Sequence, residues 1–193
     1  MYRQLFKNSI LIGIIFIFSS TAFAATGPAS TYKVTVTKFE LSSDGVNYTT
    51  VFSGTSSELD IALASGSGQA VGNFMSGLSV PDGTYTHCKV TPSATFKISG
   101  NVGTNYTKST NGPDGGCAMG TASQQGECTI TLTGGNVPTA TTQNFSSTPI
   151  TVTNGIANHK VRVSFDVSNG LRDITGSDTE IYPAIPLVTM SIQ

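Results

Sequence analysis

Apolar residues at every second position are the feature that most limits what this chain can form. The clearest predicted strand is 159–167, where from residue 160 on Lys, Arg, Ser and Asp alternate with Val and Phe. The same period recurs in residues 57–63, 84–91, 94–99, 127–133 and 188–192. No comparable run has the 3.6-residue period of a helix. Strands with one apolar and one polar face predict antiparallel sheets with one face in water.

Residues 31–41 contain a shift in this alternation. Tyr32, Val34 and Val36 keep one phase, whereas Phe39 and Leu41 keep the other. A β-bulge shifts the phase of a strand, because two of its residues oppose one on the partner strand. A strand that passes from one sheet of a sandwich to the other has the same effect. The sequence leaves both explanations open, and both indicate a sandwich.

Turn sequences separate the predicted strands. Asp44-Gly45 and Asn154-Gly155 are typical of tight hairpins, and Pro81-Asp82-Gly83 is typical of a turn. We therefore predict an all-β fold, an antiparallel β-sandwich of about 8–10 strands of Greek-key type. Residues 25–193 would form a single domain, with a long irregular loop at about 100–126. An outer-membrane barrel also alternates, but its outward positions are apolar, and here they are polar.

Residues 1–24 have the three parts of a secretory signal peptide. Arg3 and Lys7 supply the positive charge, an apolar run follows at 10–18, and Ala22-Phe23-Ala24 fits the cleavage pattern. The apolar run is about half of the ~20 residues that a membrane-spanning helix needs. We therefore expect a cleaved signal, no membrane span after its removal, and a secreted, extracellular or periplasmic protein of the cell envelope.

Few charges and many hydroxyl groups narrow the classes of function. Charged residues make up 11% of the chain, whereas it has 28 Thr and 23 Ser. This composition does not suit a coiled coil or long surface helices. The net charge is −1, and it becomes −3 once Arg3 and Lys7 are removed with the signal. Such a chain offers no basic surface, and we expect no nucleic-acid partner.

Three cysteines follow the signal, and they allow one disulfide. Cys117–Cys128 would close a short loop and hold the segment that lacks alternation, so this pairing is favoured. Cys88–Cys128 is the alternative, because both residues alternate onto core-facing positions. In the favoured pairing, Cys88 would be a small buried apolar residue.

The motifs of metal sites and of catalysis are largely missing. His87 and Cys88 are adjacent on a strand and face opposite sides, so they do not share one ion, and no zinc-binding spacing occurs. Asp114, Asp178 and Glu180 could supply loop oxygens to calcium, but turn chemistry is the favoured explanation for them. No Gly-x-Ser-x-Gly motif is present. We expect no enzyme activity, no catalytic residue, no metal and no cofactor.

Three side chains are candidates for ligand binding. Tyr85 and His87 lie on the face of 84–91 that the alternation directs outward, and Tyr48 lies near the predicted tip of a hairpin. Flat aromatic rings on a surface can stack on sugar rings. The favoured interpretation is that these side chains only cover a sheet edge.

The N-terminal half carries a series of short motifs in a fixed order. An opening strand with Val34, Val36 and Leu41 is followed by Asp60-Ile61 and then by a turn with Gly83 and Tyr85. This series, over about residues 31–100, resembles secreted bacterial β-sandwich proteins of uncharacterised function with a transthyretin-like or carbohydrate-binding-like fold. The resemblance implies an exported sandwich and no catalytic residue. Members often carry a lipid on a Cys after the signal, and this chain has no Cys there.

Together these observations predict an exported, non-enzymatic β-sandwich that acts by surface contact. It would be a cell-envelope, extracellular-matrix or adhesive component, with other envelope proteins, copies of itself or a polysaccharide as partners. A second hypothesis is a pilus or filament subunit assembled by β-strand addition, with 31–41 or 188–192 as the exchanged strand. A third is a carbohydrate-binding module.

Overall fold

Strands dominate the structure. The computed structural model describes residues 24–64, 78–173 and 179–192, and the predicted signal peptide lies outside them except for Ala24. Within these ranges there are eighteen strands and two short 3-10 helices, η1 (Ala122–Gln124) and η2 (Gly134–Asn136). The predicted all-β, sandwich-like fold is confirmed. The strands outnumber the 8–10 predicted: five have only two or three residues, and the thirteen longer ones still exceed the predicted number. No helix in the described ranges is long and apolar enough to cross a membrane.

The largest sheet has nine strands, and all of its pairs are antiparallel. Its order is β1-β16-β17-β10-β9-β8-β2-β5, and β11 also pairs with β8. The strands span Thr26–Gly27 (β1), Leu171–Asp173 (β16), Glu180–Pro183 (β17), Cys117–Gly120 (β10), Asn105–Asn111 (β9), Thr95–Val102 (β8), Ala29–Val34 (β2), Leu59–Asp60 (β5) and Cys128–Thr131 (β11).

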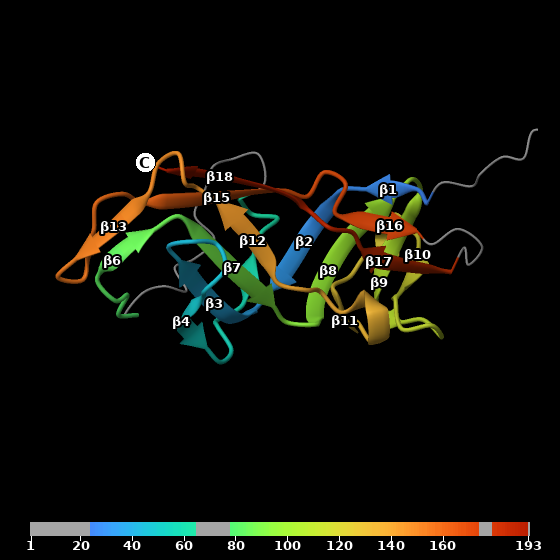
Figure 1. The fold of residues 1–193 in the computed structure, drawn as a ribbon. Helices are drawn as coiled ribbons and strands as arrows, with labels where there is room; N and C mark the ends of the chain where they lie inside the picture. The colour runs from blue at the N-terminus through green and yellow to red at the C-terminus, as the bar shows by residue number, and fades with distance from the viewer. Residues whose placement is uncertain (1–23, 65–77, 174–178, 193) are drawn as a thin grey trace, which may run out of the picture.

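Three smaller sheets hold the other strands of the described ranges, and Figure 1 shows most of these strands at the opposite end from β9, β10 and β17. A four-stranded sheet has the order β12-β7-β3-β4, with β12 at Thr141–Asn144, β7 at His87–Pro92, β3 at Val36–Ser42 and β4 at Thr49–Ser53. A three-stranded sheet joins β14 (Ile156–Ala157), β13 (Ile150–Thr153) and β6 (Gly83–Tyr85). A two-stranded sheet joins β15 (Val161–Asp166) to β18 (Leu187–Ile192).

Most buried apolar residues of the described ranges belong to one of two core clusters. The first lies at the nine-stranded sheet and contains Tyr32, Ile98, Ile130, Leu171 and Ile181 together with both cysteines of the disulfide. The second lies at the four- and three-stranded sheets and contains Leu41, Tyr85, Cys88, Phe145, Ile150 and Val152. The two-stranded sheet contributes to both clusters, because Phe165 packs against the first and Ile192 against the second.

The phase shift in residues 31–41 marks the passage of the chain from one sheet to another. β2 belongs to the nine-stranded sheet and β3 to the four-stranded sheet, with Thr35 between them. Tyr32 is therefore in the first core and Leu41 in the second. The Ser93 N–H, where the chain passes back from β7 to β8, donates to the Thr35 carbonyl at 2.8 Å. The pairing of β3 with β7 also has an irregular register near its start, so both predicted explanations apply.

The prediction of a long irregular loop at about 100–126 is wrong. This stretch holds the end of β8, all of β9 and β10, and the helix η1. β9 has no apolar alternation, because its sequence is Asn-Tyr-Thr-Lys-Ser-Thr-Asn and only Thr107 in it is buried. Its strand conformation comes from backbone pairing with β8 and β10, which a search for alternating apolar residues does not detect.

Candidate functional site

Tyr85 is buried, so the prediction that its ring is exposed for ligand binding is wrong. Its side chain is 7% exposed and belongs to the second core. Its hydroxyl donates to the Pro81 carbonyl at 2.8 Å, and burial raises its pKa. The alternation misleads here because the chain changes sheet at Thr86, between β6 and β7. Thr86 is held there by its own N–H, which donates to the Ser42 carbonyl at 2.9 Å.

His87 and Tyr48 lie beside the β3–β4 hairpin, apart from the buried Tyr85 ring. His87 is half-buried, with Nδ1 2.8 Å from the Thr86 hydroxyl and its ring against Gly45 in the hairpin turn. The Lys89 ammonium lies 3.8 Å from the centroid of the Tyr48 ring, so a cation of the chain itself covers that ring face. The three predicted ligand residues therefore do not form one aromatic platform.

The hairpin turn that covers His87 is fixed by one carboxylate. Asp44 Oδ1 accepts the backbone N–H groups of Val46 and Asn47, both at 2.8 Å, and Oδ2 accepts the Asn47 side-chain amide at 2.7 Å. The Ser42 hydroxyl adds a fourth hydrogen bond at 2.9 Å. These bonds, those from Asn47 first, hold the pKa of Asp44 far below its ordinary value. The Asp44-Gly45 hairpin predicted from the sequence is present.

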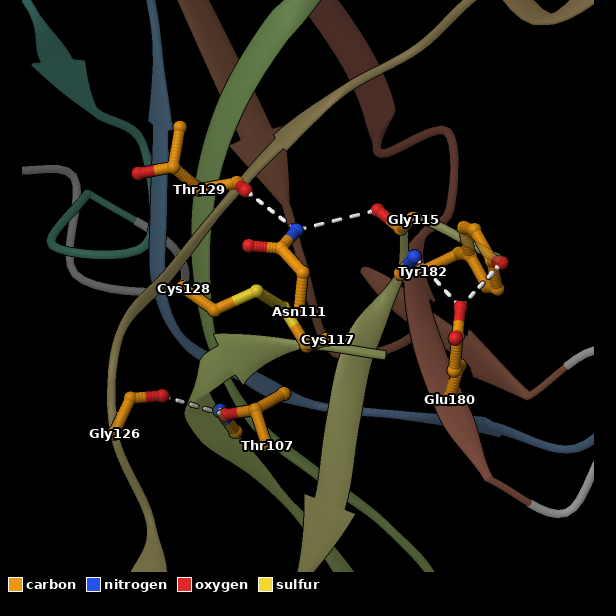
Figure 2. The surroundings of a disulfide bond; sticks show 11 residues. Thr107, Asn111, Gly115, Cys117, Gly126, Cys128, Thr129, Glu180 and Tyr182 are labelled. Carbon is orange, nitrogen blue, oxygen red and sulfur yellow. Dashed lines mark hydrogen bonds between the residues drawn. A yellow bond between two sulfur atoms is a disulfide. The ribbon is translucent and has the colours of Figure 1, made fainter. Parts of the chain in front are cut away.

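The predicted Cys117–Cys128 disulfide is present. Its S–S distance is 2.06 Å, and both cysteines are buried in the first core, where the bond joins β10 to β11 (Figure 2). Cys88 is the free cysteine, buried in the second core, and burial raises its pKa to about 11. The alternative Cys88–Cys128 pairing is therefore excluded. A disulfide is compatible with a secreted or periplasmic protein.

A buried carboxylate holds the turn next to this disulfide. Glu180 in β17 is fully buried, and it accepts the backbone N–H groups of Asp114 at 2.6 Å and Gly116 at 2.7 Å. The Tyr182 hydroxyl donates a third hydrogen bond at 2.6 Å (Figure 2). Burial alone would raise the pKa of Glu180, but the three hydrogen bonds together hold it below its ordinary value. All three partners donate hydrogen bonds to the carboxylate. They stabilise Glu180 in its negatively charged form and occupy the oxygens that a metal ion would need.

Side chains of β9 reach backbone carbonyls in and near β11. The Asn111 amide donates to the Thr129 carbonyl at 2.8 Å and to the Gly115 carbonyl at 3.3 Å (Figure 2). The Thr107 hydroxyl donates to the Gly126 carbonyl at 2.9 Å. Side chains of β9 thus satisfy three backbone carbonyls, of which that of Thr129 lies in β11. Sequence reasoning missed these residues and the role of Glu180, since polar residues on a strand without alternation carry no recognisable signal.

The predicted absence of a metal site stays a prediction. In residues 24–64, 78–173 and 179–192, no group of three or more His, Cys, Asp or Glu side chains could hold a metal ion. Of the three possible calcium ligands, Asp178 lies outside these residues. Glu180 is occupied by its three donors, one of them the Asp114 N–H.

Large apolar side chains are exposed beside the two-stranded sheet. Ile185 is 95% exposed and precedes β18, and Leu187, the first residue of β18, is 65% exposed. In Figure 1, β15 and β18 run together along one side of the molecule. Among the described strands, each of the two pairs only with the other. Open strand edges beside exposed apolar side chains are the surface best suited to contact with another molecule.

Comparison of the chain with protein-family models, with curated proteins and with solved structures finds no match, so the transthyretin-like or carbohydrate-binding-like resemblance stays an expectation.

Proposed function

We propose that this protein is an exported, non-enzymatic β-protein that acts by surface contact, as a cell-envelope, extracellular-matrix or adhesive component. The observation that carries the proposal is the open two-stranded sheet β15–β18 with Ile185 and Leu187 exposed beside it. Exposed apolar side chains lose contact with water when another surface covers them, and this favours association. The low charge of the chain and the buried disulfide support an exported protein with this role.

Binding of the purified protein to isolated cell-envelope fractions and to purified envelope polysaccharide tests this proposal. Ile185→Asp and Leu187→Asp place a charge at the contact surface and should reduce binding strongly. Val46→Asp and Ile156→Asp are matched controls, because these side chains are 79% and 74% exposed on other parts of the molecule. Equal binding by all four variants would contradict the proposed surface. Turnover in a panel of esterase and glycosidase substrates would contradict the non-enzymatic role.

A filament subunit assembled by strand addition is the second candidate. The open edge of β18 favours it, since 188–192 was one of the two strands proposed for exchange. The other, 31–41, is less suitable, because β2 lies between β8 and β5 and β3 lies between β7 and β4. Negative-stain imaging of the purified protein at high concentration would show polymers if this candidate is correct.

A further inference from the structure

β15 has a second edge without a described neighbour. It pairs with β18 over six register positions, from Val161↔Ile192 to Asp166↔Leu187. No other strand of the described ranges pairs with it. The neighbouring backbone contact is at its C-terminal end, where the Ala29 N–H of β2 donates to the Val167 carbonyl, one residue after β15, at 3.1 Å. An open edge presents unpaired N–H and C=O groups, to which a further strand can add. Two-stranded sheets are marginally stable in water, and additional strands stabilise them.

The sequence of β15 is complementary to itself in the antiparallel direction. When two copies pair about a twofold axis at Ser164, position 162 of each copy lies opposite position 166 of the other. These positions hold Arg162 and Asp166, both exposed, and residues at even spacing on a strand share one face. The twofold axis therefore creates two oppositely charged cross-strand pairs, which stabilise an antiparallel sheet.

Both charged groups can form these pairs and keep their contacts within the chain. Asp166 Oδ1 accepts the Ser168 N–H at 2.8 Å, and hydrogen bonds from Ser168 lower the pKa of Asp166, so the carboxylate is charged at neutral pH. A carboxylate has further lone pairs for a second donor. Arg162 also has an interaction within its own chain, but a guanidinium carries several N–H donors and can bond to more than one acceptor.

Other edge strands of the described ranges lack this property. β4 and β12 lie at the two edges of the four-stranded sheet. Their sequences, Thr-Thr-Val-Phe-Ser and Thr-Thr-Gln-Asn, contain no charge. Pairing of either strand with a copy of itself would have no charge pair to select one register. β15 is the strand whose charges specify both a partner and a register.

We propose that two copies of this chain associate through β15, antiparallel about a twofold axis at Ser164, with Arg162 of each copy paired to Asp166 of the other. The result is a four-stranded sheet in the order β18-β15-β15-β18 across the two copies. The same patch serves both copies, so this interface closes at two copies. The proposal does not rest on the contact function above, because it is argued from the charges of β15 and is tested by assembly alone.

Sedimentation velocity of the purified protein over a wide concentration range tests the interface. The expected result is a monomer–dimer equilibrium whose dissociation constant increases at least about tenfold in Arg162→Asp, since like charges then oppose each other twice. Asp166→Arg should have the same effect. The double variant Arg162→Asp with Asp166→Arg has the original net charge and restores opposite charges, so it should restore the dimer. Circular dichroism establishes that each variant is folded.

A cysteine at the proposed axis tests the register directly. Cross-strand neighbours in antiparallel sheets have Cα atoms roughly 4.5–5.5 Å apart, within the range that a disulfide spans. Mild oxidation of Ser164→Cys should give a covalent dimer. Ser168→Cys is the control, because this position faces 160 of the other copy and lies far from its own counterpart. A monomer at all concentrations, a dimer unaffected by Arg162→Asp, or equal cross-linking of both variants would each overturn the proposal.

Discussion

The Tyr182 hydroxyl donates a 2.6 Å hydrogen bond to the buried carboxylate of Glu180, two residues earlier in β17. The same carboxylate holds the backbone N–H groups of Asp114 and Gly116 in the turn before β10. Gly112 and Gly116 pack against the carboxylate so closely that neither position has room for a Cβ. Strand β17 thus fixes the turn that leads directly into the disulfide.

Replacing this carboxylate by an amide should destabilise the protein strongly. Glu180→Gln keeps the size of the side chain, but its NH2 group can only donate where three donors already point. We expect a loss of about 2–3 kcal/mol in the free energy of unfolding, measured by urea denaturation. Tyr182→Phe is the matched control, because it removes one of the three hydrogen bonds and should lose about 1 kcal/mol. Equal losses in the two variants would contradict the role assigned to the carboxylate.

The same carboxylate should make stability depend on pH in the acid range. The pKa of Glu180 is lowered in the folded protein from an ordinary value of 4.5. Its stabilising contribution is therefore complete above that value and is lost as the pH falls through the lower, folded pKa. Gln at 180 does not titrate. The difference in unfolding free energy between wild type and Glu180→Gln should narrow as the pH falls below about 4.5, and a constant difference would refute the assignment.

Loss of the disulfide should lower stability without involving Cys88. The bond joins cysteines 11 residues apart, and opening so short a loop is expected to cost about 3 kcal/mol. Urea denaturation of the wild type with and without dithiothreitol measures this loss, and Cys117→Ser with Cys128→Ser should reproduce it. Cys88→Ala is the control, since it should respond to the reductant as the wild type does. A wild-type protein indifferent to the reductant would show that the bond does not stabilise it.

Cys88 should be unreactive in the folded protein. Its side chain is 6% exposed, and burial raises its pKa to about 11. Alkylation requires a thiolate that the reagent can reach, and both conditions are missing near neutral pH. We expect iodoacetamide at pH 8 to label the wild type only after unfolding in urea. Ser123→Cys, on the exposed helix η1, provides the positive control. Rapid labelling of the folded wild type would place Cys88 at the surface.

The fold class could be predicted because burial imposes alternation on the strands that carry the cores. Cys128 and Ile130 in β11 are both buried, as their alternation predicts. The sheet change at Thr35 was visible because apolar residues stand on both sides of the shift. The change at Thr86 was not visible, because Tyr85 continues the outward phase of His87 and Lys89 although it turns into the second core.

The surroundings of the disulfide could be predicted only in part. The pairing of Cys117 with Cys128 followed from their short separation and from the segment they enclose. The role of Glu180 did not, because its backbone partners lie 64 and 66 residues earlier in the chain. A contact between one side chain and two distant peptide groups depends on the finished topology of the sheet and leaves no pattern in the sequence.

The hairpin turn over His87 allows backbone strain to be separated from crowding. Gly45 and Gly155 have nearly the same φ, +76° and +73°. A Cβ added at 45 would lie 2.9 Å from the His87 ring, whereas a Cβ added at 155 would have no neighbouring atom of the described residues within 4 Å. Gly155→Ala should lose about 1–2 kcal/mol from the left-handed backbone alone. Gly45→Ala should lose a further ~1–3 kcal/mol from overpacking. In a His87→Ala background the extra loss should disappear, as a double-mutant cycle by urea denaturation would measure. Persistence of the extra loss without the imidazole would show that the ring does not pack against this turn.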